Sequence, residues 1–430
     1  MSKLQAAVSA ILALRVELNQ YECILTNKQR QSTPGLFNVK FKQFLENRER
    51  YFLEIIEGRR HHRSDRLVLG FLFVASRFYR MAVQFRLWLY DKRFFRNHAT
   101  GCQVVSIGNL TCGGTGKTPV VEVFAKSLTR QGRKVAILSR GYRSKEQRKF
   151  YQKLLGMFSS RKRELLPPRV VSDGKDLLLQ SDAAGDEPYM LASNLQDVAV
   201  LVDKDRVNAG LYAIDEYAID TLILDDGFQY LRLKAHINIV LVDSTSPFGN
   251  HHVLPRGLLR EPIKNIRRAD YVFLTKSNGG NHLRHLKTFI RRHNRRAEII
   301  ECCHKPLYLE RVFMRGSQQP LTNLKNCKVA AISAIAKPES FEAFLLGFGA
   351  EIVHTARYAD HHRYTEQQIL DFVKEAKAAG AEMIVTTEKD AVRIPRLLRE
   401  DIHFYFLRVE IDILSGQENF DQCIKRICFI

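Results

Sequence analysis

A glycine-rich segment that ends in lysine and threonine carries the most informative chemistry of the chain. Residues 104–107 are mostly apolar and β-branched, and they lead into Gly113, Gly114, Thr115, Gly116, Lys117 and Thr118. In a Walker A loop, backbone N–H groups surround the phosphates, the lysine reaches the outer ones and the hydroxyl holds Mg²⁺. Thr111 stands where the standard spacing has its first glycine. We therefore predict a nucleoside triphosphate site with a modified loop.

An acidic pair follows a second apolar run, at residues 221–224. Asp225 and Asp226 come directly after this run and precede a glycine. A buried parallel strand places its last residue at the carboxyl edge of the sheet, where ligands of open α/β sheets bind. Taken alone, an apolar run that ends in Asp is an ordinary strand end as often as it is part of a ligand site. Together with Lys117 and Thr118, however, this pair predicts a metal–nucleotide site.

Three further segments suit either a catalytic site or a solvated loop. Asp186 and Glu187 are adjacent carboxylates, which repel unless Mg²⁺, a lysine or a proton lies between them. Residues 360–362 place a carboxylate beside two imidazoles, which is one way to orient a base and tune its pKa. Residues 254–262 include two arginines and a glutamate, and such arginines can clamp phosphate.

The eight cysteines include no C-x-x-C pair, so a reducing cytoplasm fits the chain best. The run Cys302, Cys303 and His304 suggests metal ligands at first sight. Adjacent cysteines point to opposite faces of a strand, and no second pair exists to complete a site. We therefore interpret this run as structural.

Short β-branched runs alternate with helical stretches through most of the chain. Strands are predicted at residues 103–107, 135–138, 198–202, 221–224, 237–242, 271–275, 329–333 and 383–387. This alternation predicts an α/β fold of the P-loop NTPase type, with a mostly parallel sheet flanked by helices. Because 430 residues exceed one average core, we expect more than one unit. The predicted division is a helical N-terminal extension over 1–66, a core over 67–304 and a second, smaller α/β domain over 305–430. Residues 144–169 read as a basic surface insertion.

The chain is strongly basic, with a formal net charge of +21, and about half of the excess lies in its first 100 residues. Such a charge favours a polyanion: nucleic acid, an anionic membrane or a phosphorylated substrate. Residues 67–75 are apolar, too few for the roughly 20 that span a bilayer. Arginines then alternate with aromatic residues up to residue 96, which predicts a helix in the membrane interface. A core helix with solvated arginines is the alternative.

Read in order, these segments resemble the tetraacyldisaccharide 4′-kinases of lipid A synthesis. In that family Thr111 at the position of the missing glycine is normal. The resemblance covers the chain from about residue 67 to its end. It rests on residues 106–119, 138–142, 185–188, 224–229, 254–262, 360–362 and 387–392.

The resemblance implies that the γ-phosphoryl group of ATP passes to the 4′-hydroxyl of an acylated glucosamine disaccharide that carries a 1-phosphate. Asp186 would be the catalytic base, paired with His361 as a dyad. Residues 113–118 would hold ATP, and Arg260 and Glu261 would line the active site. The implied Mg²⁺ ligands are Thr118, Glu187, Asp225 and Asp226.

The implied partners are the lipid A disaccharide 1-phosphate and an anionic membrane surface, with no nucleic acid and no obligate protein partner. The implied location is peripheral, on the cytoplasmic face of a bacterial-type inner membrane. Two positions depart from the family pattern: Tyr230 replaces a histidine, and residues 333–336 lack the usual glycines.

Two other functions are weighed against the kinase. One is a P-loop GTPase or metallochaperone-like switch, because residues 275–278 resemble a guanine-reading segment, although without its aspartate. The other is a nucleic-acid-stimulated ATPase, which the charge alone suggests.

Overall fold

The computed structural model describes residues 54–55, 63–141, 167–280, 282–395 and 402–429. Most of the predicted extension over residues 1–66 and most of the basic insertion over 144–169 lie outside these residues. The division of the chain at residues 304 and 305 stays a prediction.

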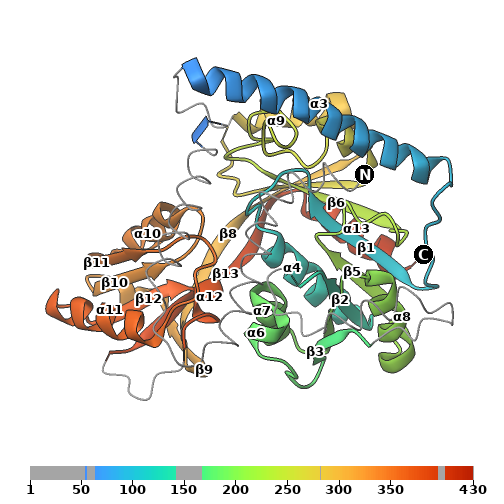
Figure 1. Cartoon of the computed structure of the whole chain (residues 1–430). Helices are drawn as coiled ribbons and strands as arrows, with labels where there is room; N and C mark the ends of the chain where they lie inside the picture. Colours follow the sequence, from blue (N-terminus) through green and yellow to red (C-terminus); the bar gives the residue numbers. More distant parts are fainter. Residues whose placement is uncertain (1–53, 56–62, 142–166, 281, 396–401, 430) are drawn as a thin grey trace, which may run out of the picture.

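Thirteen strands in the described residues form one continuous sheet (Figure 1). Its order is β11-β10-β12-β13-β8-β7-β6-β1-β5-β2-β4-β3, and β9 pairs with β8 outside this path. The pairs β3–β4, β8–β13 and β8–β9 are antiparallel and the rest are parallel, which confirms the predicted mostly parallel α/β fold. The strands are β1 (Gln103–Asn109), β2 (Val135–Ser139), β3 (Arg169–Asp173), β4 (Val198–Val202), β5 (Thr221–Asp225), β6 (Ile237–Asp243), β7 (Tyr271–Thr275), β8 (Glu298–Arg311), β9 (Met314–Pro320), β10 (Lys328–Ser333), β11 (Glu351–Arg357), β12 (Met383–Thr387) and β13 (Phe404–Ser415).

Helices pack along both faces of this sheet, and a long helix lies across the top of the molecule (Figure 1). The helices are α3 (Arg63–Asp91), α4 (Lys117–Arg130), α6 (Ser181–Ala184), α7 (Asp186–Asn194), α8 (Arg206–Tyr217), α9 (His282–His293), α10 (Pro338–Gly347), α11 (Glu366–Ala378), α12 (Glu388–Ala391) and α13 (Gln417–Cys428), with 3₁₀ turns η1 (Ile263–Arg268) and η2 (Leu321–Leu324).

The core holds the phosphate-loop helix firmly against the centre of the sheet. The strands β2, β4 and β5 are mostly apolar and are buried along their whole length, because helices cover both of their faces. The ring of Phe124 on α4 lies 5.5 Å from that of Phe273 on β7 and 5.1 Å from that of Phe420 on α13. These edge-to-face contacts fix the start of α4 relative to the ends of the strands.

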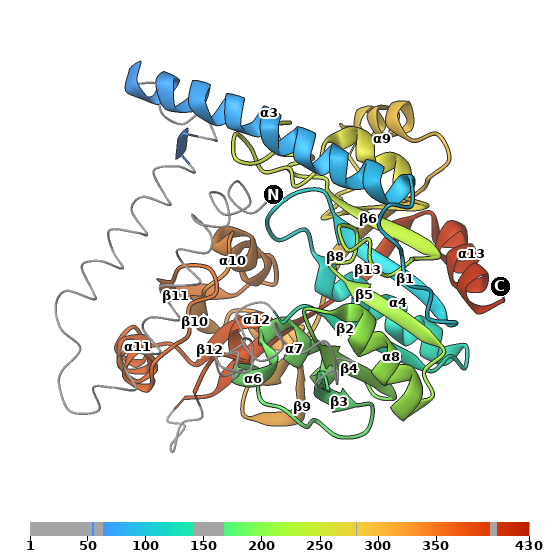
Figure 2. The same ribbon diagram turned by 45° about the vertical axis from the view of Figure 1, so that its right-hand side comes forward.

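The long helix α3 is mostly exposed, although it runs alongside the folded core (Figure 2). Its exposed side chains include Phe71 at 74 %, Phe78 at 57 % and Trp88 at 46 %. By length and composition alone, the segment from Asp65 to Asp91 is long and apolar enough to cross a membrane, and 11 % of its most apolar window is buried. The apolar character therefore extends past the nine residues seen in the sequence, since aromatic residues separate the arginines.

Candidate active site

The phosphate loop connects β1 to α4, as its sequence predicts. Gly116 precedes the helix with φ 76°, and Gly113 has φ 114°, both in the left-handed region that favours glycine. A Cβ atom added at Gly116 would lie 2.9 Å from Nε2 of His304. The loop thus needs glycine both for its backbone conformation and for space. Free N–H groups at the start of α4 provide a site for phosphate oxygens.

Residues at the ends of neighbouring strands brace this loop from behind. The Nδ2 atom of Asn109 donates a hydrogen bond to Oγ1 of Thr115 at 3.0 Å. The hydroxyl of Thr275 donates to the carbonyl oxygen of Thr115 at 2.8 Å, and Nζ of Lys276 donates to that of Gly114 at 2.8 Å. This role of Thr275 and Lys276 was not predicted, because the sequence of their segment resembles a base-reading element.

Asp226 lies next to the phosphate loop and is held by two cations. Nζ of Lys117 lies 3.5 Å from its Oδ1, and the guanidinium of Arg260 contacts both carboxylate oxygens at 2.8 and 2.6 Å. Burial alone would raise the pKa of Asp226, but Lys117 and Arg260 lower it to about 2. Its backbone is in the left-handed region, with φ 54°. The predicted Lys117, Asp226 and Arg260 therefore converge.

Asp225 is a buried carboxyl beside other negative charge. The hydroxyl of Ser139 donates to its Oδ2 at 3.2 Å. Burial and the charge of Glu187 raise the pKa of Asp225, because each disfavours its ionised form. A cation close to Asp225 would favour its ionised form and so would counteract both the burial and the charge of Glu187.

Glu187 stands between the two halves of the site. Burial acts to raise the pKa of Glu187, but Lys389 and Lys117 together lower it. Nζ of Lys389 lies 3.1 Å from its Oε1. Glu187 thus faces a lysine of the phosphate loop and a lysine of the C-terminal half.

Across the described ranges, no three His, Cys, Asp or Glu side chains are grouped into a complete metal site. Asp225 and the neighbouring Glu187 instead form a pair of carboxyls beside a phosphate loop. This donor set fits Mg²⁺, which proteins bind through one or two carboxylates together with substrate phosphates.

Asp186, the first residue of α7, meets His361 as predicted. Nδ1 of His361 lies 3.7 Å from Oδ2 of Asp186. Two arginines also hold this carboxylate: Nε of Arg393 at 2.9 Å and a terminal nitrogen of Arg363 at 2.9 Å. Burial acts to raise the pKa of Asp186, but His361, Arg393 and Arg363 lower it to about 2. Asp186 is therefore ionised at neutral pH.

Arg393 organises the dyad from a fully buried position. Its guanidinium donates to Oδ1 of Asp390 at 3.0 Å and lies 3.0 Å from Nδ1 of His361. Because arginine can only donate, Nδ1 of His361 accepts this bond. Lys389 adds a contact of 3.5 Å to the other ring nitrogen of His361. Residues 387–392 contribute to the family resemblance, but no role was predicted for Lys389, or for Arg393 just after this segment.

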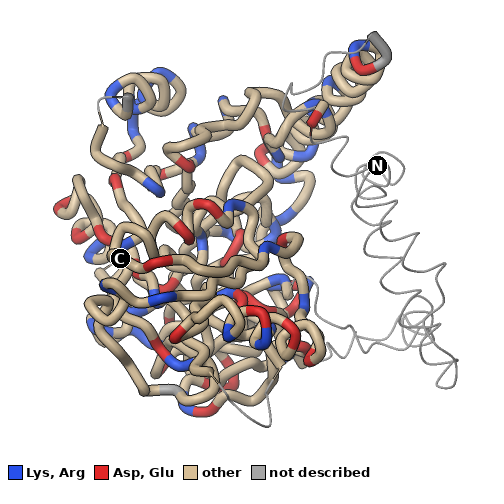
Figure 3. Tube along the Cα trace, turned by 90° about the vertical axis from the view of Figure 1, so that its left-hand side faces the viewer, with Lys and Arg blue, Asp and Glu red and all other residues tan. Residues whose placement is uncertain are grey.

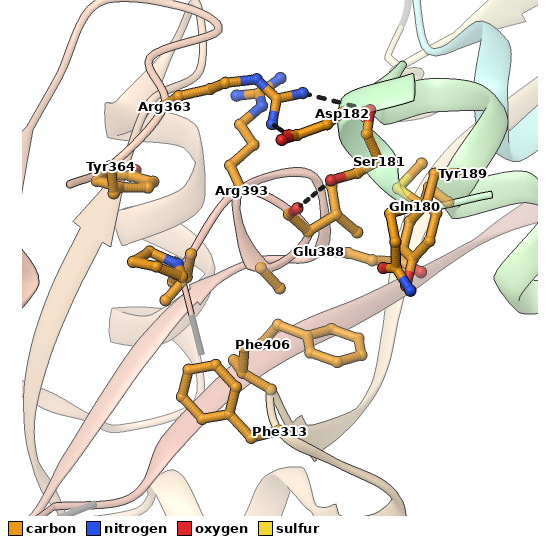
Figure 4. Close-up of a pocket in the computed structure, with 16 residues that line it drawn as sticks. Gln180, Ser181, Asp182, Tyr189, Phe313, Arg363, Tyr364, Glu388, Arg393 and Phe406 are labelled. Atoms are coloured by element: carbon orange, nitrogen blue, oxygen red, sulfur yellow. Dashed lines mark hydrogen bonds and ion pairs between the residues drawn. The ribbon is translucent and has the colours of Figure 1, made fainter. Parts of the chain in front are cut away.

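Figure 4 shows how the C-terminal half meets α6 at this seam. Arg363 reaches Asp182 as well as Asp186, and the hydroxyl of Ser181 donates to the carbonyl oxygen of Val392 at 3.0 Å. A cavity of about 640 Å³ lies beside these contacts, with Arg363 and Arg393 in its lining. The seam therefore consists mainly of polar contacts that reach the dyad.

Two other residues of interest, Glu261 and Tyr230, have hydrogen-bond partners outside the phosphate loop. Glu261 is buried and accepts hydrogen bonds from Arg268 at 2.6 Å and Asn265 at 2.8 Å, so its carboxylate supports η1. The hydroxyl of Tyr230 donates to Asp205 at 3.1 Å, next to the start of α8. Tyr230 is thus engaged in the core.

Comparisons with known proteins show the family of the chain. A family model described as LpxK, tetraacyldisaccharide-1-P 4′-kinase, matches residues 68–428. A tetraacyldisaccharide 4′-kinase of Halothermothrix orenii is 31 % identical, over 88 % of this chain and 97 % of its own. That of Syntrophus aciditrophicus is 37 % identical, over 84 % and 94 %.

Among solved structures, LpxK from Aquifex aeolicus in complex with ATP is similar, with a TM-score of 0.64 and 27 % identity, over 84 % of this chain and 99 % of that one. The family match runs from α3 to α13 and includes the phosphate loop, both acidic pairs and the segment of His361. The chain belongs to the tetraacyldisaccharide 4′-kinase family.

Proposed function

We propose that this chain transfers the γ-phosphoryl group of ATP to the 4′-hydroxyl of tetraacyldisaccharide 1-phosphate, a step of lipid A biosynthesis. The position of Glu187, between Lys117 of the phosphate loop and Lys389 beside His361, carries this proposal. It supports a single site that combines a nucleotide loop with a dyad. A GTPase-like switch finds less support, because Thr275 and Lys276 are engaged in bracing the loop rather than free to read a base.

The phosphate loop would bind ATP through residues 113–118. Lys117 would exchange its contact with Asp226 for the outer phosphates, while Arg260 keeps that carboxylate compensated. Mg²⁺, when bound, neutralises charge on the β- and γ-phosphate oxygens. Its protein ligands would be Thr118, Glu187, Asp225 and Asp226, of which Asp225 gains most, since a cation restores its ionised form.

Asp186 would accept the hydrogen bond of the sugar hydroxyl. Each of its oxygens accepts from one arginine and can accept a further hydrogen bond. The hydroxyl would approach from the side of Arg363, because that side chain is 43 % exposed whereas that of Arg393 is 0 % exposed. Arg393 then keeps Asp186 and His361 in place. In phosphoryl transfer, such positioning matters more than early proton removal.

The exposed aromatic face of α3 supports a peripheral position on the cytoplasmic face of a bacterial-type inner membrane. Aromatic and apolar side chains would enter the interface, and the interleaved arginines would meet anionic headgroups. The lipid substrate would then reach the site without leaving the membrane. The predictions of no nucleic-acid partner and no obligate protein partner remain to be tested.

The direct experiment measures transfer of labelled γ-phosphate from ATP to detergent-solubilised tetraacyldisaccharide 1-phosphate. We expect labelled lipid, and we expect Asp186→Asn to lower turnover by at least about 10²-fold while ATP still binds. Asp182→Asn is the matched control, because Asp182 also pairs with Arg363 but is 62 % exposed, whereas Asp186 is 11 % exposed. Rapid GTP hydrolysis without labelled lipid would contradict the proposal.

The membrane position is tested by flotation with anionic vesicles. Phe71→Ser combined with Phe78→Ser should weaken binding, whereas Leu346→Ser on α10, 57 % exposed, should not. The single tryptophan, Trp88, reports on α3 directly, and its emission should shift to shorter wavelength on vesicle addition. Unchanged flotation of the Phe double variant would argue against this position.

A further inference from the structure

A cationic cleft lies between α3 and the core, apart from the residues assigned to catalysis. Its volume is about 390 Å³, and it is bounded by α3, by loop residues around 251–264 and by the end of α9. Among the residues that the structure describes, no Asp or Glu lines it. Its basic and imidazole side chains are Arg77, Arg80, Lys264, His251, His252 and His293.

The three cations of this cleft lack the compensation that other arginines of the molecule have. Within the portion of the chain that the structure describes, no carboxylate pairs with Arg77, Arg80 or Lys264. By contrast, Arg260 and Arg393 each contact a carboxylate. Like charges that share a concave site repel one another, and a bound anion relieves the repulsion.

Neighbouring groups indicate the same positive environment. The ring of His252 packs edge-on against Phe73, with centroids 6.1 Å apart. Burial, Arg256 and His251 lower the pKa of His252, so the imidazole is neutral at neutral pH and can accept or donate a hydrogen bond. The cleft therefore combines fixed positive charge with neutral polar groups, which suits a phosphate oxygen.

The position of the cleft indicates an anion that is attached to acyl chains. Phe73, which lines the cleft, is 45 % exposed, and Phe71 beside it is 74 % exposed. Figures 1 and 2 show α3 and α9 on the same side of the molecule. Figure 3 shows basic positions, in blue, along the upper part of the molecule from which α3 projects. A bilayer that contacts α3 would bring its headgroups to this cleft.

We propose that this cleft binds the phosphate group of a membrane lipid. The proposal rests on the proposed membrane position of α3. Two lipids supply this chemistry: an anionic phospholipid and the substrate itself, through its 1-phosphate. The cleft also adjoins the active site, because Tyr79, next to Arg80, donates a hydrogen bond to the carbonyl oxygen of Arg260 at 3.0 Å. Lipid bound in the cleft would steady the loop that holds Asp226.

The test compares two double variants of the full chain. The first, Arg77→Gln with Lys264→Gln, removes two charges from the cleft. The control, Arg284→Gln with Arg292→Gln, removes two exposed charges from α9, which do not line it. Thermal unfolding confirms that both variants are folded. The binding probe is short-chain phosphatidylglycerol, with short-chain phosphatidylcholine as the neutral comparison, followed by Trp88 emission. The kinetic probe is the KM for the disaccharide with and without its 1-phosphate.

We expect one of two changes in the cleft variant and neither in the control. The affinity for phosphatidylglycerol should fall at least about tenfold, or the KM for the disaccharide should rise at least about tenfold. Weaker phosphatidylglycerol binding identifies a phospholipid, and a higher KM only for the 1-phosphorylated disaccharide identifies the substrate phosphate. Equal effects of both variants, or no effect of either, would overturn the proposal. Phosphoryl transfer by the unmodified chain is measured separately. If it is absent, the proposed function is contradicted, while the lipid-binding measurement still tests the cleft.

Discussion

Arg408 on β13 joins three elements that surround the active site. One terminal nitrogen donates to both carboxylate oxygens of Glu388 on α12, at 2.6 and 2.7 Å. The other contacts Glu122 on α4, the helix that begins at the phosphate loop. The side chains of Arg408 and Glu122 are 5 % and 4 % exposed. Replacing this arginine tests whether a buried charge holds the two halves of the site together.

Arg408→Met keeps the apolar stem and removes the charge. Glu122 retains Lys126, at 2.8 Å, whereas the partner that Glu388 retains among the described residues is the amide of Asn194, at 2.6 Å. Removing one partner of a buried ion pair costs about 3–5 kcal/mol, because the other charge stays buried without compensation. Since Lys126 still serves Glu122, we expect a loss of about 3 kcal/mol in the free energy of unfolding.

Urea unfolding at pH 7.5 measures this loss. Arg357→Met is the matched control, because Arg357 also pairs with two glutamates but is 47 % exposed, so its loss should change stability little. Burial already raises the pKa of Glu388, and the variant should raise it further. A carboxyl whose pKa is higher in the folded state than in the unfolded state destabilises the folded state only while it is ionised. The loss in the free energy of unfolding should therefore shrink as pH falls toward the ordinary pKa of 4.5. A loss below about 1 kcal/mol, or one that grows with acidity, would refute the reasoning.

Three further predictions use other parts of the site. Gly116→Ala should abolish ATP binding in a fluorescent-nucleotide titration with an unchanged circular dichroism spectrum, because a Cβ there lies 2.9 Å from His304 at φ 76°. Burial lowers the pKa of His304 to about 4, so folding should lose stability as pH falls from 6.5 toward 4, and His304→Phe should remove that part of the thermal profile. Burial raises the pKa of Cys302 and Cys423 to about 12, so mass spectrometry should find both unlabelled by iodoacetamide in the folded protein at pH 8.

The strands and the phosphate loop could be predicted because their signal is local. All eight predicted strands are present, since runs such as residues 198–202 are apolar at every position and are buried on both faces. The strand β8 extends past the predicted domain boundary at residues 304 and 305, and this extension had no such signal. Polar and apolar residues follow no regular alternation over Glu298–Arg311, and the strand is stabilised by antiparallel pairing with β13, about a hundred residues later. Pairing between residues so far apart produces no pattern that a short window of sequence would show.

The candidate site also has parts that the sequence predicted and parts that depend on contacts between distant residues. Asp186 and His361 were predicted from the family pattern, and the structure brings them together. Their partner Arg393 lies over 200 residues from Asp186 in the chain, so only the folded molecule shows that one guanidinium serves both. Glu261 belongs to a segment that reaches the site, yet its carboxylate faces Arg268. The direction of a side chain depends on tertiary contacts that the segment alone does not specify.

The hydrogen bonds of α3 to the core have a practical consequence for preparing this protein. Besides Tyr79, Gln84 donates to Asn265 at 3.1 Å and Arg86 donates to the carbonyl oxygen of Gln229 at 3.1 Å. Gln229 in turn donates to the carbonyl oxygen of Asn109, at the end of β1 just before the phosphate loop. Deleting the helix to obtain a detergent-free fragment would therefore strip the nucleotide pocket of supports on two sides. Solubility is better sought by substitutions on the outer aromatic face, with every core-facing residue of the helix retained.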